Sequence, residues 1–277
     1  MPRWIWSLCL SLLALPALAQ NALSRPASDD AATAPTQLRQ AAPPPPDASA
    51  EQLEARGDEL RARKAYADAL DYYRAALADS KAAALTNSEI AALHNKSGIA
   101  HLQMLHYKMA KKEFGRAIKL DPTYAEPLNN LGVVDYIQNN PKKAIGRYLK
   151  AIELKAGVAS FHSNLGTAYF TRKQYDKASS AYLQALELDP DIFERESPAG
   201  VSARMVSPSD RARFSYVIAK MYAKTGNSDR CLLYLRKAME AGYAGIDDVY
   251  KDEEFSQVRK DPRFGELMAS KPVAITN

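Results

Sequence analysis

Apolar residues recur at helical spacing from Glu51 to about residue 270. In this long segment Ala, Leu and Tyr return every few positions, and Gly and Pro fall at intervals. Such spacing gathers apolar side chains on one face of a helix, so it predicts a series of amphipathic helices. Residues 20–49 differ, because few large apolar residues occur among their Ala, Pro, Ser, Gln and Asp.

The helical pattern repeats along the chain at a fixed interval. Gly98, Gly132 and Gly166 are evenly spaced, and each is followed at fixed distances by Ala, an aromatic residue and Ala again. These columns are Ala110, Ala144 and Ala178, then Phe114, Tyr148 and Tyr182, then Ala117, Ala151 and Ala185. Asp121-Pro122 and Asp189-Pro190 close two of the units. The interval is about 34 residues, and a period of this length indicates stacked helix-turn-helix units.

These columns resemble the tetratricopeptide repeat, with each glycine at position 8 of a 34-residue unit. The resemblance implies an all-α, right-handed superhelical solenoid of about five helix-turn-helix repeats with a C-terminal helical cap. Glycine at position 8 and alanine at position 20 would lie where the two helices of a unit cross. The aromatic residue at position 24 would fill the gap to the next unit, and Asp-Pro would end the second helix.

The resemblance covers about residues 50–270. We expect a repeat array at 50–243 and C-terminal capping helices at 244–277. The predicted units are about 50–83, 91–124, 125–158, 159–192 and 212–243. Extra residues within 82–88 predict a lengthened second helix in the first unit. The insert at 191–209 predicts a long loop, which either forms a functional surface or folds back over the array. In the cap, Phe255, Val258, Phe264 and Leu267 are expected to cover the last unit.

The N-terminus has the pattern of a secretory signal. Arg3 precedes an apolar run, Trp4 to Leu15, and Ala17-Leu18-Ala19 fits the cleavage pattern before Gln20. We therefore expect a signal peptide at 1–19, a disordered Ala/Pro-rich linker at 20–49, and a periplasmic or secreted protein. An uncleaved membrane anchor is the alternative. The four prolines that end the linker are either a stiff spacer or a proline-recognition ligand.

Charge and cysteine content restrict the function classes. The sequence has 37 basic and 32 acidic residues, a formal net charge of +5, and the two signs are mixed along the chain. A nucleic-acid-binding protein usually clusters its basic residues on one face, so we expect no nucleic-acid partner. Cys9 and Cys231 are too few for a disulfide framework. Cys231 holds a small-residue position of the last unit and is expected to be a buried, inert thiol.

No set of residues predicts catalysis, a cofactor or a metal site. His94 and His101 are seven residues apart on one predicted helix face, but no Cys, Asp or Glu completes a ligand set at matching spacing. His101 and Asp135 share position 11 of successive units, which makes a hydrogen bond between them conceivable. Such a pair would be either structural or sensitive to pH.

The resemblance also implies that the first helix of each unit lines a concave groove. The predicted partner-binding residues there are Asn95, Lys96, Ile99, Asn129, Asn130, Val133, Tyr136, Ile137, Asn164, Thr167 and Phe170. Asparagine both donates to and accepts from a peptide backbone, and the apolar residues offer contacts to side chains. The alternative is an ordinary solvated face. A clamp for a C-terminal carboxylate needs particular residues at five groove positions. Only one of them, Asn130, is present here, so we reject this kind of binding site.

The sequence therefore predicts an exported, non-enzymatic scaffold or adaptor for a protein or peptide partner, set by analogy in cell-envelope assembly. It predicts no membrane span after signal cleavage. The alternative function is a self-associating structural oligomer of the envelope.

Overall fold

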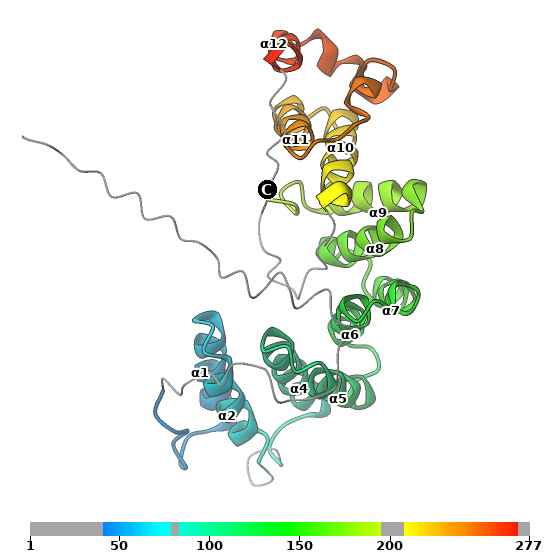
Figure 1. Cartoon of the computed structure of the whole chain (residues 1–277). Helices are drawn as coiled ribbons and strands as arrows, with labels where there is room; N and C mark the ends of the chain where they lie inside the picture. Colours follow the sequence, from blue (N-terminus) through cyan, green and yellow to red (C-terminus); the bar gives the residue numbers. More distant parts are fainter. Residues whose placement is uncertain (1–40, 79–82, 195–207, 271–277) are drawn as a thin grey trace, which may run out of the picture.

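Residues 41–78, 83–194 and 208–270 are described by a computed structural model, in which helix pairs follow one another in a curved stack (Figure 1). These ranges contain no strand. The predicted fold class, an all-α solenoid of about five helix-turn-helix repeats with a C-terminal helical cap, is confirmed. None of the described helices is both long and apolar enough to cross a membrane. The predicted signal, most of the linker and most of the 191–209 insert lie outside the described residues.

Within the described residues, each of five units contributes two helices, here called A and B in chain order. The A and B helices are α1 (Ala50–Ala62) and α2 (Tyr66–Ala76), α4 (Asn87–Gln103) and α5 (Tyr107–Leu120), α6 (Ala125–Ile137) and α7 (Pro141–Leu154), α8 (Ala159–Thr171) and α9 (Tyr175–Leu188), and α10 (Pro208–Lys224) and α11 (Ser228–Glu240). Each A helix packs against its own B helix, and each of the first four B helices also packs against the A helix of the next unit.

The glycine column lies where the A and B helices of a unit pack together. A Cβ added to Gly98 would lie 2.5 Å from the Phe114 ring, and one on Gly132 would lie 2.6 Å from the Tyr148 ring. The same close approach occurs between Gly57 and Tyr73 and between Gly166 and Tyr182. The aromatic residue at position 24 therefore covers the glycine of its own unit, in addition to any role between units. Because the ring occupies the space of a side chain, only glycine fits beneath it without a shift.

The turn between the A and B helices uses left-handed backbone at position 15 of every unit. Lys64, Leu105, Asn139 and Lys173 have φ values of 58–62°, and Gly226 of the last unit has 78°. The next residue donates its N–H to a carbonyl five residues earlier, as His106 does to His101 at 2.9 Å. This is the helix C-terminal motif in which glycine is preferred, since a Cβ disfavours left-handed backbone.

Leu105→Gly is expected to raise the free energy of unfolding by about 1 kcal/mol. Its side chain is 52% exposed, so the substitution removes strain and loses little burial. Urea unfolding followed by circular dichroism measures the change. Asn139→Gly is the matched control and should gain less, because asparagine tolerates left-handed backbone. A lower stability for Leu105→Gly would contradict this account of the turn.

The extra residues between the first two units lengthen a different helix from the one predicted. Helix α2 ends at Ala76, whereas α4 begins at Asn87 and has 17 residues, against 13 in α6 and in α8. Thr86 and Glu89 form a capping box that fixes this early start. The prediction of a lengthened second helix in the first unit is wrong, because this strong N-terminal cap draws the additional turn into α4.

The described C-terminal residues form three 3₁₀ helices, η3 (Ile246–Tyr250), η4 (Glu253–Ser256) and η5 (Val258–Lys260), and then α12 (Pro262–Ser270). Phe255, Val258, Phe264 and Leu267 are all at most 4% exposed and lie in one apolar cluster with residues of α10 and α11. Asp261 accepts a hydrogen bond from the backbone N–H of Arg263, which caps the start of α12. These segments cover the side of the last unit that no further unit covers.

Candidate functional site

Four asparagines on the A helices of the second, third and fourth units form a hydrogen-bonded ladder. Asn130 donates to Asn95 Oδ1, and Asn164 donates to Asn129 Oδ1, both over 2.9 Å. Asn129 donates to Asn130 Oδ1 at 3.2 Å, which joins the two links within one helix. All four side chains are at most 5% exposed. The ladder therefore ties α4, α6 and α8 together through their side-chain amides.

An ion pair continues this ladder toward the first unit. Lys96 Nζ lies 2.6 Å from Glu54 Oε1 and also bonds Asp58 on α1. Lys96, Asn130 and Asn164 share position 6, and their partners Glu54, Asn95 and Asn129 share position 5 of the preceding unit. One contact rule therefore links the first four units, with a charged pair at one end and neutral amides in the middle.

The other predicted groove residues divide by burial. Val133, Thr167 and Phe170 are at most 4% exposed, so they mainly pack the array. Ile99, Tyr136 and Ile137 are half-buried. The Tyr136 hydroxyl lies 2.9 Å from Thr171 Oγ1 on the next A helix, and burial raises its pKa above the usual tyrosine value. Partner binding by the groove residues stays a prediction, and it now depends mainly on the three half-buried residues.

Two exposed residues lie in line with the half-buried residues of the predicted groove. Gln103 and Thr171 occupy position 13 of the second and fourth units, on either side of Ile137 in the third. With Ile99 and Tyr136 they make a strip of mixed character, here called the inner strip. It has amide and hydroxyl groups for a peptide backbone and apolar groups for side chains.

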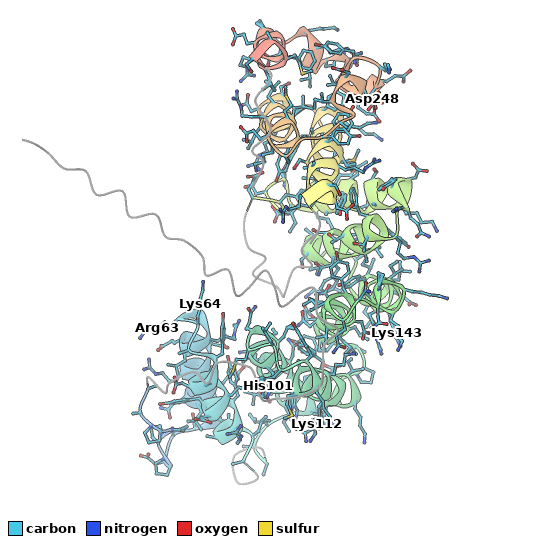
Figure 2. All side chains as sticks on the ribbon, viewed as in Figure 1. Arg63, Lys64, His101, Lys112, Lys143 and Asp248 are labelled. Atoms are coloured by element: carbon cyan, nitrogen blue, oxygen red, sulfur yellow. The ribbon has the colours of Figure 1, made fainter. Side chains whose placement is uncertain are left out.

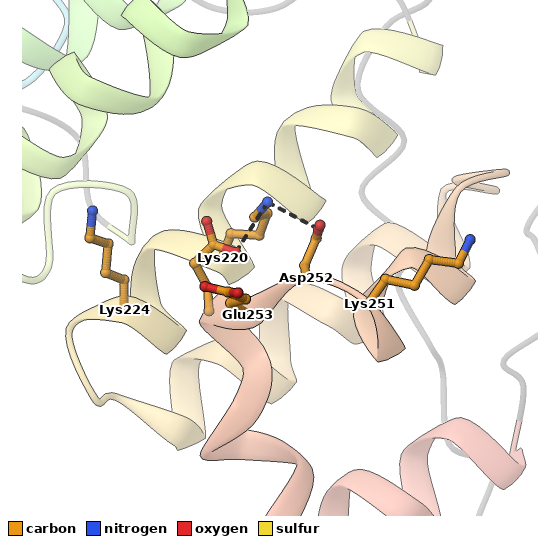
Figure 3. Close-up of a pocket in the computed structure, with 6 residues that line it drawn as sticks. Lys220, Lys224, Lys251, Asp252 and Glu253 are labelled. Atoms are coloured by element: carbon orange, nitrogen blue, oxygen red, sulfur yellow. Dashed lines mark ion pairs between the residues drawn. The ribbon is translucent and has the colours of Figure 1, made fainter.

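The inner face of the last unit is occupied by the chain's own cap (Figure 3). Asp252 accepts a hydrogen bond from Tyr216 at 2.7 Å and lies 3.0 Å from Lys220 Nζ. Glu254 lies 3.3 Å from the same ammonium group. Burial alone would raise the pKa of Asp252, but the hydrogen bonds from Tyr216 and Lys220 lower it, so it stays ionised. Tyr216 and Lys220 hold positions 5 and 9, which line the groove in earlier units, so the cap limits the inner strip to the second to fourth units.

The predicted hydrogen bond between His101 and Asp135 is wrong. Asp135 pairs instead with Lys111, whose Nζ lies 2.9 Å away on α5, and with Arg147 at 3.8 Å. A cation on the adjacent B helix satisfies a buried carboxylate better than a neutral imidazole does. Among the described residues His101 Nδ1 has no hydrogen-bond partner, although it is buried. Burial, followed by the charge of His106, lowers the pKa of His101.

A second histidine, His94, forms a pair with Glu113 that was not predicted from the sequence. His94 Nδ1 lies 2.6 Å from Glu113 Oε2, and Arg116 donates to the other carboxylate oxygen at 2.8 Å. Burial alone would raise the pKa of Glu113, but His94 and Arg116 lower it. No sequence motif marks this pair, since its members face each other across α4 and α5. In the described part of the chain, no group of three or more His, Cys, Asp or Glu residues is placed to hold a metal ion.

Cys231 is fully buried on α11, and burial raises the pKa of its thiol to about 12. Only the thiolate reacts readily, so we expect no modification by iodoacetamide at pH 8 while the protein stays folded. Mass spectrometry with and without urea checks this. Labelling of the folded protein at the rate of the unfolded one would show that the thiol is reactive.

Comparisons with known proteins identify the repeat in the fourth unit. Residues 159–192 match the family model for the tetratricopeptide repeat. No curated protein matches the sequence. Among solved structures, MamA 41-end from Desulfovibrio magneticus RS-1 is 18% identical, with 72% of this chain and 97% of that chain covered and a TM-score of 0.46. YrrB, titled a TPR protein with an unusual peptide-binding site, is 21% identical, with 76% and 92% covered and a TM-score of 0.44. TTC0263 from Thermus thermophilus, titled a thermophilic TPR protein, is 17% identical, with 80% and 100% covered and a TM-score of 0.47.

Proposed function

Because this chain is a tetratricopeptide-repeat protein, we propose that it acts as an interaction scaffold that holds an extended segment of a partner protein along its inner strip. The observation that carries the proposal is the arrangement of the A helices. Their buried asparagine ladder fixes α4, α6 and α8 side by side, and it leaves a row of half-buried and exposed residues beside it. A rigid row of this kind lowers the entropy lost on binding, since the protein side is already ordered.

The chemistry of the inner strip suits a peptide better than a small molecule. Gln103 and Thr171 supply donors and acceptors for main-chain groups, while Ile99, Tyr136 and Ile137 supply apolar contacts. Peptide recognition commonly combines main-chain hydrogen bonds with separate contacts for side chains. The strip is about three units long and ends at the acidic cap.

The proposed setting is the periplasm or the exterior of the cell, in envelope assembly. Its support is the signal-like sequence from Arg3 to Ala19, which lies outside the described residues. N-terminal sequencing of the protein from its native host tests this step. A mature chain that begins at Gln20 is expected, and one that keeps the segment from Met1 to Ala19 would favour the anchor.

Binding is tested with the full chain and a phage-displayed library of random peptides. Peptides selected on the wild-type protein should lose affinity about tenfold, or about 1.4 kcal/mol, for a variant with Gln103→Arg and Thr171→Arg. Both side chains are exposed, so the substitutions crowd the inner strip. Thr171→Arg also removes the hydrogen bond to the Tyr136 hydroxyl, which belongs to the same strip.

Ser180→Arg together with Gln184→Arg is the matched control, since both residues are exposed on the outer side of the array, on α9. This control should keep wild-type affinity. Equal loss in both variants, or no loss in the inner-strip variant, would remove the proposal.

A further inference from the structure

The excess of basic over acidic residues in this chain is concentrated on two helices. Helices α5 and α7 together carry nine basic and two acidic residues, an excess larger than the net charge of +5 for the whole chain. The remainder of the chain is therefore net acidic. The two signs look mixed along the chain because the weakly charged α6 separates these two helices in the sequence.

Six lysines on the outer side of these helices have no carboxylate partner among the described residues. They form the basic face and are Lys108, Lys112 and Lys119 on α5 and Lys142, Lys143 and Lys150 on α7. All six are exposed. At 100° per residue the three lysines of α5 lie within about 40° of one another around that helix axis, and the three of α7 lie within about 100° around theirs. On each helix they lie opposite the buried alanine and aromatic columns. Figure 2 labels Lys112 and Lys143, one on each helix.

The B helices of the first and fourth units lack this basic excess, because α2 and α9 each carry one more acidic than basic residue. Lys108 and Lys142 share position 18, where the fourth unit has Asp176 and the first has Ala67. Arg116 and Lys150 share position 26, where the fourth unit has Gln184. The charge is therefore a local feature of two adjacent outer helices and not a general property of the B helices.

Exposed apolar side chains lie beside the lysines. Met109 on α5 is 41% exposed, and Leu149 on α7 is 46% exposed. Helices α5 and α7 are wholly described, and neither exposes an aromatic ring, since Phe114 and Tyr148 are buried and Tyr107 is half-buried. A surface of lysines with apolar residues between them is typical of proteins that lie on a bilayer, where the lysines meet lipid phosphates and the apolar groups enter the headgroup region.

The same residues fit other polyanions less well. Single-stranded nucleic acid is bound with aromatic platforms, which the basic face lacks. Protein interfaces are enriched in arginine and depleted in lysine, because lysine is strongly hydrated. Lysine acts as a point charge and suits many dispersed phosphates, without the fixed geometry that a specific carboxylate partner requires.

We propose that the basic face docks the outer side of the second and third units onto an anionic phospholipid bilayer. The inner strip then faces away from the membrane and stays open to a protein segment. Each lysine near an anionic surface contributes modestly, so the attraction depends on all six together and falls as salt screens it.

Sedimentation of the full chain with vesicles tests the proposal. We expect binding to vesicles of phosphatidylglycerol and phosphatidylcholine that exceeds binding to pure phosphatidylcholine and that falls as NaCl is raised. In a variant with Lys108, Lys112, Lys142 and Lys143 changed to Gln, the affinity for the anionic vesicles should fall on the order of 100-fold. The apolar segment near the N-terminus is common to all variants, so it cancels in the comparison.

A charge-matched variant is the control for net charge. It carries Gln at four exposed lysines outside the basic face, which are Lys173, Lys224, Lys251 and Lys260. It should bind like the wild-type chain, and circular dichroism confirms that both variants fold. Equal binding by the two variants, no preference for anionic vesicles, or binding to duplex DNA without binding to vesicles would each overturn the proposal.

Discussion

Gly132→Val is expected to lower the free energy of unfolding by about 3 kcal/mol. A Cβ at this position would lie 2.6 Å from a ring carbon of Tyr148 and 3.1 Å from Cβ of Arg147 on α7. Tyr148 is fully buried, so its ring has no open space to move into. The helices must separate to accept the new side chain, which also weakens their contacts with neighbouring units. Urea unfolding monitored by circular dichroism measures the loss.

Gly146→Ala is the control, because it also replaces a helical glycine in the same unit. A Cβ there meets nothing within 4 Å. The substitution should raise stability by about 1 kcal/mol through helix propensity alone. If Gly132→Val were as stable as the wild-type chain, the close crossing of α6 and α7 would be refuted.

Asn130→Leu is expected to cost about 3 kcal/mol. Leucine has a similar volume but cannot make either hydrogen bond of the ladder. Asn95 Oδ1 loses its donor, and a side-chain N–H of Asn129 loses its acceptor. Both groups are buried, so water does not replace the lost partners without rearrangement. Urea unfolding of this variant measures the cost.

A double-mutant cycle with Asn95→Leu separates the ladder from general burial. The two substitutions together should cost clearly less than the sum of their separate effects, because one lost hydrogen bond is shared. Gln103→Leu serves as the control on the same face, and its exposed side chain should change stability by less than about 0.5 kcal/mol. Strictly additive effects of the two asparagine substitutions would contradict the ladder.

The repeat register could be predicted from the sequence because it depends on side-chain size. A constant number of residues separates Gly98, Gly132 and Gly166, and the same number separates the aromatic residues that follow them, so the period is found by counting along the sequence. The helix pairs and the packing of Phe255 and Val258 in the cap follow from the same size and polarity pattern. The length of α4 could not be predicted in this way, because the capping box at its start and the run of alanines before it favour different helix boundaries.

The groove prediction named suitable residues but gave several of them the wrong environment. Asn129 and Asn130 were predicted to face a peptide, whereas each bonds an asparagine of a neighbouring unit. The sequence contains a signal for this, since both inter-unit pairs are spaced by 35 residues, one more than the period. Residue type alone could not reveal it, because asparagine serves equally in a ladder and in a binding site.

The basic face was missed because charge was assessed along the chain. Lys108 and Lys142 are one full repeat apart in sequence, yet they hold equivalent places on the second helices of adjacent units. Five basic residues and one acidic residue lie between Lys108 and Lys119, and four basic residues lie between Lys142 and Lys150, so a count over each predicted helix reveals the excess that the total for the whole chain hides. The Lys111–Asp135 pair likewise joins helices of different units and has no linear signature.

The scaffold proposal is tested most directly by site-specific photo-crosslinking. A photoreactive residue is placed at Gln103 or Thr171 on the inner strip, or at Ser180 or Gln184 on the outer side, and the full chain is irradiated with a peptide selected on the wild-type protein. The account predicts cross-links from the two inner positions and none from the two outer ones. Cross-links from Ser180 or Gln184 alone would contradict it.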